Sequence, residues 1–220
     1  MTFPLLTFAS LREISKPETP YSRIIRVHSR LGFAVMIRPA VPEDVNGAIP
    51  LILQAIEDIA FVLSGTAGVA ETTKILSEFF RQPGNRLSYE QTLVMEENGE
   101  VVGIAIVYDG ADADALNSPV EQAAAKKSGN PDYKIPLEPE VCEFYLDAVG
   151  VLPRCHGRGY GSALIEAGCD HARMLGHKRF ALLVDLDNPA AKRLYDRLGL
   201  RVDGSKWLAG KEYYHMVREL

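Results

Sequence analysis

Three glycines at alternate positions could hold a phosphate group. Gly157, Gly159 and Gly161 follow an apolar run that Pro153 ends, since proline cannot donate to a sheet ladder. Because glycine has no side chain, the backbone N–H groups of this bend can approach a bulky anion closely. A helical period begins at Ser162, so the bend meets a helix N-terminus, whose dipole and unpaired donors favour negative charge. The stretch therefore predicts a site for a phosphorylated ligand.

The spacing of these glycines distinguishes between the known phosphate loops. A Walker loop has lysine and then Ser or Thr after its last glycine, whereas Gly161 is followed by Ser162 and Ala163. The dinucleotide pattern G-x-G-x-x-G fails too, because Ser162 or Leu164 stands where the third glycine belongs. The pattern that fits is V-x-P-x-x-[Arg/Gln]-G-x-G-x-G, at Val151, Pro153, His156, Gly157, Gly159 and Gly161. It resembles the acetyl-CoA pyrophosphate loop of the GNAT superfamily of N-acetyltransferases, with His156 in place of the usual Arg or Gln.

A second segment resembles the same family. Asn188, Ala191, Leu194, Tyr195 and Gly199 match its N-x-x-A-x-x-L-Y-x-x-x-G-[F/L] helix residue by residue. The asparagine is a good helix cap, and the glycine suits the left-handed turn that ends a helix. Two motifs in the family's order make a chance match improbable.

The resemblance implies acetyl-CoA as co-substrate and an acetyl transfer to a primary amine by direct attack. The five histidines show no metal-ligand spacing with one another or with cysteine, so we expect no metal. It places the thioester carbonyl against backbone N–H groups near Val149, Gly150 and Val151, where they would stabilise an oxyanion. Tyr195, with a reference pKa of about 10, could protonate the departing thiolate. The cofactor-binding set expected from the resemblance is Val149, Gly150, Val151, His156, Gly157, Arg158, Gly159, Tyr160, Gly161, Ser162, Asn188 and Tyr195.

A general base would help, because a free alkylamine is mostly protonated near pH 7. Glu143, Tyr145 and Asp147 alternate along the strand before the glycines and so share one face. The next parallel strand offers Leu183 instead of an acid. This favours Asp147 and then Glu143 as the base, although surface charge or a core hydrogen bond explains either acid equally well.

The elements that position these residues predict an α/β fold, a GNAT-like three-layer α-β-α domain with a central mixed, mostly antiparallel sheet. The apolar patterns indicate helices from Pro42 through Ile59, over 71–80, from Ser162 through Leu175, and after Asn188. Strands are expected over 35–38, 91–96, 101–108, 145–152, 179–186, 200–206 and 212–217, with Asn98-Gly99 as a hairpin turn.

Two segments depart from this pattern. Residues 1–35 are basic and lack a clean apolar period, so we expect an N-terminal extension, poorly ordered or outside the domain of 36–220. A long acidic insertion at about 109–141 holds a helix candidate over 112–127 and then three prolines. Over 109–147 nine acids face three lysines, which favours a cationic acceptor if these acids lie near the substrate.

The composition limits the remaining classes of protein. The 220 residues carry a formal charge of −5 and contain no apolar run near the roughly 20 residues of a membrane span, so we expect neither nucleic acid nor a membrane as partner. Three cysteines without a C-x-x-C pattern predict reduced thiols in a cytoplasmic protein. The partner would be a small-molecule amine or a protein amine, and a homodimer is compatible with the pattern. Two alternatives stay open: a non-catalytic acetyl-CoA-binding module, and a nucleotide-dependent enzyme.

Overall fold

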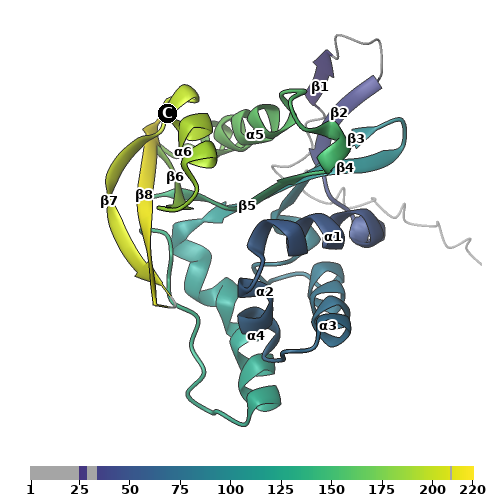
Figure 1. The fold of residues 1–220 in the computed structure, drawn as a ribbon, viewed down its shortest axis with the longest axis vertical. Coiled ribbons are helices and arrows are strands. Elements are labelled where there is room, and N and C mark those ends of the chain that lie inside the picture. The colour runs from purple at the N-terminus through teal and green to yellow at the C-terminus, as the bar shows by residue number, and fades with distance from the viewer. Residues whose placement is uncertain (1–24, 29–33, 209) are drawn as a thin grey trace, which may run out of the picture.

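The computed structural model describes residues 25–28, 34–208 and 210–220, and its core is one eight-stranded sheet (Figure 1). The strand order is β1-β2-β3-β4-β5-β6-β8-β7. All neighbours pair antiparallel except β5 and β6, so the predicted mixed, mostly antiparallel sheet is confirmed. The strands are β1 (Ile25–His28), β2 (Ala34–Pro39), β3 (Thr92–Glu97), β4 (Glu100–Asp109), β5 (Phe144–Val151), β6 (Arg179–Asp185), β7 (Arg201–Leu208) and β8 (Lys211–Glu219).

Helices cover both faces of this sheet and give the three predicted layers (Figure 1). One face packs against α1 (Val45–Ile56), α2 (Ile59–Ser64), α3 (Val69–Arg81) and α4 (Ala113–Ser128). The other face packs against α5 (Tyr160–Met174) and α6 (Pro189–Arg197). Each face has its own buried cluster: Tyr108 and Tyr145 lie in the α1 cluster, whereas Phe144 and Tyr195 lie in the α5 cluster.

Two predicted helix boundaries were wrong. The first helix does not run to Ile59, because Glu57 leaves the helical conformation and α2 begins separately, with Ile59 partly exposed. The helix after the glycines begins at Tyr160 instead of Ser162, and Leu175 lies exposed beyond its end. In both cases the apolar period continues past a point where the backbone turns.

The N-terminal segment contributes a strand to the sheet. β1 pairs with β2 in register from Ile25 opposite Ile37 to His28 opposite Ala34, inside the segment expected to be an extension. β2 itself begins before Met36, and the Val35 side chain is buried. The sheet therefore reaches back to Ile25, and the expectation of an extension stays untested for 1–24 and 29–33, which lie outside the described residues.

The acidic insertion forms the helix that its composition allowed and then an irregular return. α4 covers 113–128, and the chain from 129 to 143 crosses back to β5 without a helix or strand. Glu121 fixes this return, because its carboxylate accepts hydrogen bonds from the backbone N–H of Ile135 at 2.9 Å and from Lys134 at 2.7 Å. The insertion is thus folded onto the α1 face.

Candidate functional site

The parallel pair at the centre of the sheet separates after three residues. β5 and β6 pair only from Phe144 opposite Phe180 to Leu146 opposite Leu182. Beyond that point the end of β5 pairs with β4 alone and the end of β6 with β8 alone, so the two strands diverge (Figure 1). Main-chain groups on the inner edges of both strands are therefore left without a sheet partner, which makes this a natural place for a ligand to bind the backbone.

A β-bulge lies where the strands begin to diverge. Ile106 pairs with Ala148 and Val107 with Leu146, so Asp147 is an extra residue in β5. A bulge bends its strand and re-aims the residues around it. The bulge thereby orients Val149, Gly150 and Val151, which carry the expected oxyanion donors, and these three remain paired with β4.

The glycine loop follows β5 and leads into α5. Gly157 and Gly159 have left-handed φ angles of 74° and 82°, which glycine tolerates best. A Cβ placed on either of them, or on Gly161, would meet nothing within 4 Å, so the loop faces open space. Gly159 is the N-cap of α5 and supplies no side-chain cap, which leaves the first N–H groups of the helix free. This geometry fits a pyrophosphate held by main-chain donors, as the sequence predicts.

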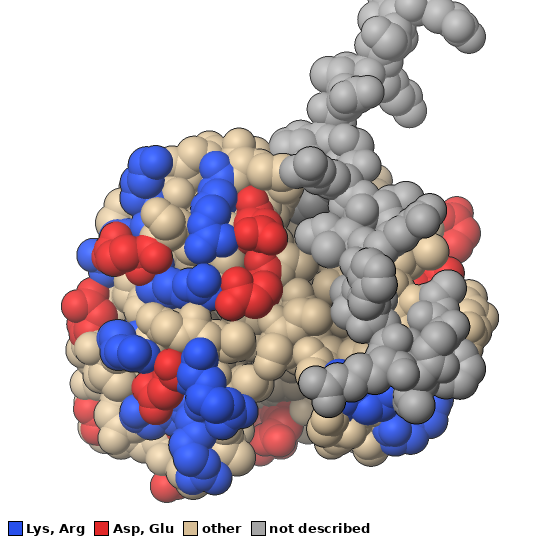
Figure 2. All heavy atoms as spheres, turned by 90° about the horizontal axis from the view of Figure 1, so that it is seen from above, with Lys and Arg blue, Asp and Glu red and all other residues tan. Residues whose placement is uncertain are grey.

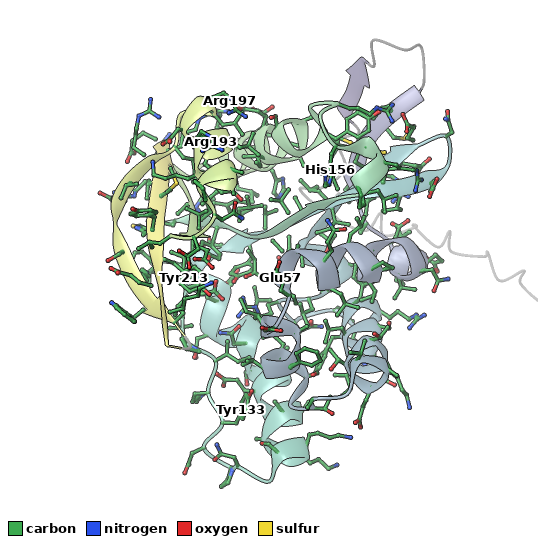
Figure 3. All side chains as sticks on the ribbon, viewed as in Figure 1. Glu57, Tyr133, His156, Arg193, Arg197 and Tyr213 are labelled. Carbon is green, nitrogen blue, oxygen red and sulfur yellow. The ribbon has the colours of Figure 1, made fainter. Side chains whose placement is uncertain are left out.

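The charged and aromatic side chains of this loop point elsewhere. Arg158 forms an ion pair with Glu97 on β3 and lies 4.6 Å from the centre of the Tyr160 ring. The Tyr160 hydroxyl donates to the same carboxylate at 2.7 Å. His156 Nε2 donates to the carbonyl of Val151 at 2.9 Å, although the ring itself is exposed (Figure 3). These three residues brace the loop against β3 and β5, and sequence reasoning missed Glu97 because it lies 61 residues from Arg158.

The second motif lies on α6, on the α5 face of the sheet. The Asn188 side chain accepts a hydrogen bond from the N–H of Ala191 at 3.0 Å, so it caps the helix as predicted. Tyr195 is only 9% exposed, and no described residue forms a hydrogen bond with its hydroxyl. Burial raises the pKa of Tyr195 to about 12. The phenol therefore stays protonated at neutral pH and has its O–H group available as a donor.

Asp147 lies in a buried ionic network instead of facing open space. Its carboxylate binds the guanidinium of Arg86, whose side chain is 3% exposed and also donates to Glu138 at 2.7 Å and to Asn117 at 3.2 Å. The Tyr108 hydroxyl adds a further hydrogen bond. Burial raises the pKa of Asp147 to about 6, while Arg86 opposes the shift and favours the ionised form. Two carboxylates thus share one buried cation.

Glu143 is fully buried and has every oxygen engaged. One oxygen accepts from the N–H of Glu140 at 2.9 Å and from His215 Nε2 at 3.1 Å, and the other lies 3.5 Å from Arg179. The Gly110 N–H donates to its carbonyl at 2.8 Å. The residue ties the return of the insertion to the start of β5 and to β8.

Five of the nine acids over 109–147 have Lys or Arg partners, which the sequence count did not reveal. Glu121 binds Lys134 and Glu140 binds Lys206, in addition to the pairs of Glu138, Glu143 and Asp147 with arginines. Their charges are largely compensated within the protein, so the expected negative field over the substrate is much weaker than nine acids suggest. Residues such as Arg86, far away in sequence, could not be assigned as their partners from composition.

Comparison with known proteins agrees with this geometry. The family model described as "Acetyltransferase (GNAT) family" matches residues 56–200, well over half of the chain. The chain belongs to this GNAT family. A crystal structure of an acetyltransferase superposes with a TM-score of 0.69 at 32% identity, covering 83% of this chain and 98% of that one. An N-acetyltransferase from Staphylococcus aureus Mu50 has the same fold, with a TM-score of 0.67 at 22% identity, covering 83% and 99%.

Curated relatives match a shorter stretch of this GNAT chain. A mycothiol acetyltransferase from Salinispora arenicola is 40% identical over 79 residues, which is 36% of this chain and 24% of that protein. Another from Mycobacteroides abscessus is 43% identical over 65 residues, which is 30% and 21%. The chain thus matches less than a quarter of the length of these relatives.

Among the residues that the structure describes, no helix is long and apolar enough to cross a membrane, and no cluster of three metal-binding side chains occurs. Figure 2 shows one end of the molecule, where groups of Lys and Arg are interspersed with Asp and Glu over the part not covered by grey atoms.

Proposed function

We propose that this protein transfers an acetyl group from acetyl-CoA to a primary amine by direct attack of the amine on the thioester. The observation that carries the proposal is the separation of β5 from β6 beside a glycine loop that opens onto free space. Acetyl-CoA supplies the acetyl thioester. The loop from Gly157 to Ser162 would hold the pyrophosphate through main-chain N–H groups at the start of α5.

The β5 backbone would act on the thioester carbonyl. Val149, Gly150 and Val151 follow the bulge at Asp147, on the edge of β5 that β6 has left. A backbone N–H there can donate to an oxygen that gains negative charge when the amine attacks, and a fixed donor costs no reorganisation at that moment. The amine nitrogen first adds to the thioester carbon and forms the C–N bond, and the carbonyl oxygen takes the negative charge. Return of this charge to the carbon breaks the C–S bond and releases the CoA thiolate, while the proton of the amine passes to solvent water.

Tyr195 would act on the leaving sulfur. A phenol whose pKa is about 12 gives up its proton reluctantly to a thiolate whose ordinary pKa is about 8.5. We therefore assign Tyr195 a hydrogen bond to the departing sulfur instead of the full proton transfer expected from its reference pKa. The free hydroxyl and the nine-tenths burial of the side chain support this role.

Asp147 and Glu143 receive positioning roles in place of the proton-accepting role expected from the sequence. A base must reach the proton that it removes. Asp147 is bound to Arg86 and Tyr108, and Glu143 has no exposed surface. We propose that the first fixes the bulge and the second fixes the start of β5.

The acceptor is an unidentified amine, and we favour a cationic small molecule over a protein amine. The name of the mycothiol acetyltransferases describes those proteins, and the short match carries no acceptor over to this chain. Cys142, Cys155 and Cys169 are all free, which supports a cytoplasmic location. A homodimer stays a prediction that gel filtration would test.

The test is a panel of amines incubated with acetyl-CoA, with released CoA measured by thiol titration and the product by mass. The proposal expects CoA release that depends on amine and a product heavier by one acetyl group. Tight acetyl-CoA binding without amine-dependent release would favour the non-catalytic module instead. Preference for ATP or NAD over acetyl-CoA would favour the nucleotide-dependent enzyme.

A further inference from the structure

Glu57 has an unusual backbone conformation at the end of α1. Its φ of 46° and ψ of −122° end the helix, although a charged residue at that point could have continued it. Among the described residues only Glu57 and Asn98 combine a side chain with positive φ. Asn98 belongs to an Asn-Gly hairpin turn, which explains its angle. Glu57 and Asp58 are the central residues of a turn whose angles are close to type II′, and the first of these two positions favours glycine. A glutamate there is strained, and strain of this kind is found at sites that use the residue.

The last turns of α1 lie directly against the part of β5 that borders the proposed acetyl site. A Cβ on Gly150 would come within 2.8 Å of the carbonyl oxygen of Leu51. One turn later, Gln54 Nε2 lies 3.5 Å from the carbonyl oxygen of Val151. Glu57 follows Gln54 by three residues, and Figure 3 shows it at the end of α1, below β5 in this view.

Tyr213 on β8 lies on the α1 side of the sheet. Tyr214 packs in the α5 cluster, and neighbouring strand residues point to opposite faces, so Tyr213 faces the helices of the α1 side. Burial raises the pKa of Tyr213; Lys211 opposes this shift, and the carboxylates of Asp185, Glu138 and Glu57 add to it.

Of these three carboxylates, Glu57 is the one left free. Asp185 forms an ion pair with Lys211, and Glu138 binds Arg86 and the Tyr145 hydroxyl. The Glu57 carboxylate is exposed and has no hydrogen-bond or ion-pair partner among the described residues. An uncompensated, exposed carboxylate where α1 ends against the proposed acetyl site is suited to a cation.

We infer that Glu57 binds a cationic group of the acceptor, remote from the amine that is acetylated. This inference rests on the proposed acetyl transfer and names a substrate class for it: amines that carry a second positive charge. A preference for cationic acceptors would then come from one residue at the α1–α2 junction. It would not come from the acids of 109–147, many of which already pair with Lys or Arg. No covalent step is assigned to Glu57.

The first test measures binding without chemistry. The protein is loaded with CoA, and putrescine or n-butylamine is titrated into it by calorimetry. These amines have the same carbon chain and differ by the second ammonium group. We expect putrescine to bind more tightly, and Glu57→Gln to remove about five-fold of that advantage, the upper range for an exposed ion pair. Glu43→Gln is the matched control, because Glu43 is an exposed acid at the opposite end of the same helical segment.

The second test separates this inference from the proposed function. With acetyl-CoA, the ratio of kcat/KM for putrescine over n-butylamine should fall about five-fold in Glu57→Gln, mainly through KM, while the affinity for acetyl-CoA stays unchanged. Turnover of both amines with an unaltered ratio in Glu57→Gln would overturn the inference and leave the proposed function intact. Failure of putrescine to bind the CoA-loaded protein better than n-butylamine would overturn it even if no amine were acetylated.

Discussion

Removing the negative charge of Asp147 should destabilise the protein far more than it alters proton transfer. Asp147→Asn keeps the shape of the side chain and leaves Arg86, 3% exposed, with less negative charge around it. Breaking a buried ion pair from one side costs about 3–5 kcal/mol. Arg86 keeps Glu138 and Asn117, and the new amide oxygen can still accept a hydrogen bond. We therefore expect a loss in the free energy of unfolding at the lower end of this range, about 3 kcal/mol.

Urea unfolding of wild type, Asp147→Asn and Glu78→Gln measures this loss. Glu78 is the control, since its ion pair with Lys74 is long, at 4.0 Å, and exposed on α3. Its removal should cost at most about 0.5 kcal/mol. A triple variant, Arg86→Met with Asp147→Leu and Glu138→Gln, removes the buried cation and both of its carboxylates and should lose less stability than Asp147→Asn alone.

The competing role for Asp147 gives a different result. If this carboxylate accepted the proton of the amine, Asp147→Asn would fold with wild-type stability and lose nearly all turnover. The wild-type profile of kcat/KM against pH would then show an acid limb near pH 6, the pKa of Asp147, and this limb would vanish in the variant. That pair of results would refute the positioning role.

Three further predictions test other parts of the account. Tyr195→Phe should lower kcat about 10–100-fold with little change in acetyl-CoA affinity, because it removes one hydrogen bond to a developing charge; an unchanged kcat would show that Tyr195 only packs. Burial lowers the pKa of His171 to about 4, so the unfolded chain binds a proton that the folded chain excludes between pH 6.5 and 4. The stability that neutral, buried His171 contributes is complete above pH 6.5 and is lost as the pH falls toward 4. Between pH 7 and 5 the free energy of unfolding, measured with urea, should therefore fall by about 2 kcal/mol more in wild type than in His171→Gln. Equal losses in the two proteins would contradict this. A chain beginning at Met36 should be about 2 kcal/mol less stable than one beginning at Ile25, because it lacks β1 and the buried Val35; equal melting temperatures would mean that β1 adds no stability.

The fold and the conformation of the glycine loop could be predicted because their signals are local. The glycines from 157 to 161 and the capped helix after Asn188 each encode their conformation within a dozen residues. The three layers could be predicted because the apolar periods of the sequence correspond to helices and strands in the structure. The predicted ends of these elements were less accurate, for example at Glu57, where the chain turns inside an apolar pattern.

The acceptor side could not be predicted in the same way, because it depends on contacts between distant residues. Asp147 and Arg86 are 61 positions apart, and His215 is 72 positions from Glu143. Alternation over 143–147 predicted two acids on one face of this stretch, but it could not show that cations from other elements already bind them. For the same reason Glu57 gave no signal in the sequence: its importance lies in a φ angle and in the absence of a partner among the described residues.

The affinity of Gly159→Val for acetyl-CoA, measured by calorimetry, tests the central claim most directly. A valine there places a branched side chain in the open space before α5 and disfavours the φ of 82°. Gly129→Val controls for strain, because Gly129 has a φ of 71° and equally open surroundings at the end of α4. We predict at least a tenfold weaker affinity, about 1.4 kcal/mol, for Gly159→Val and unchanged affinity for Gly129→Val. A folded Gly159→Val protein that binds acetyl-CoA as tightly as wild type would contradict the account.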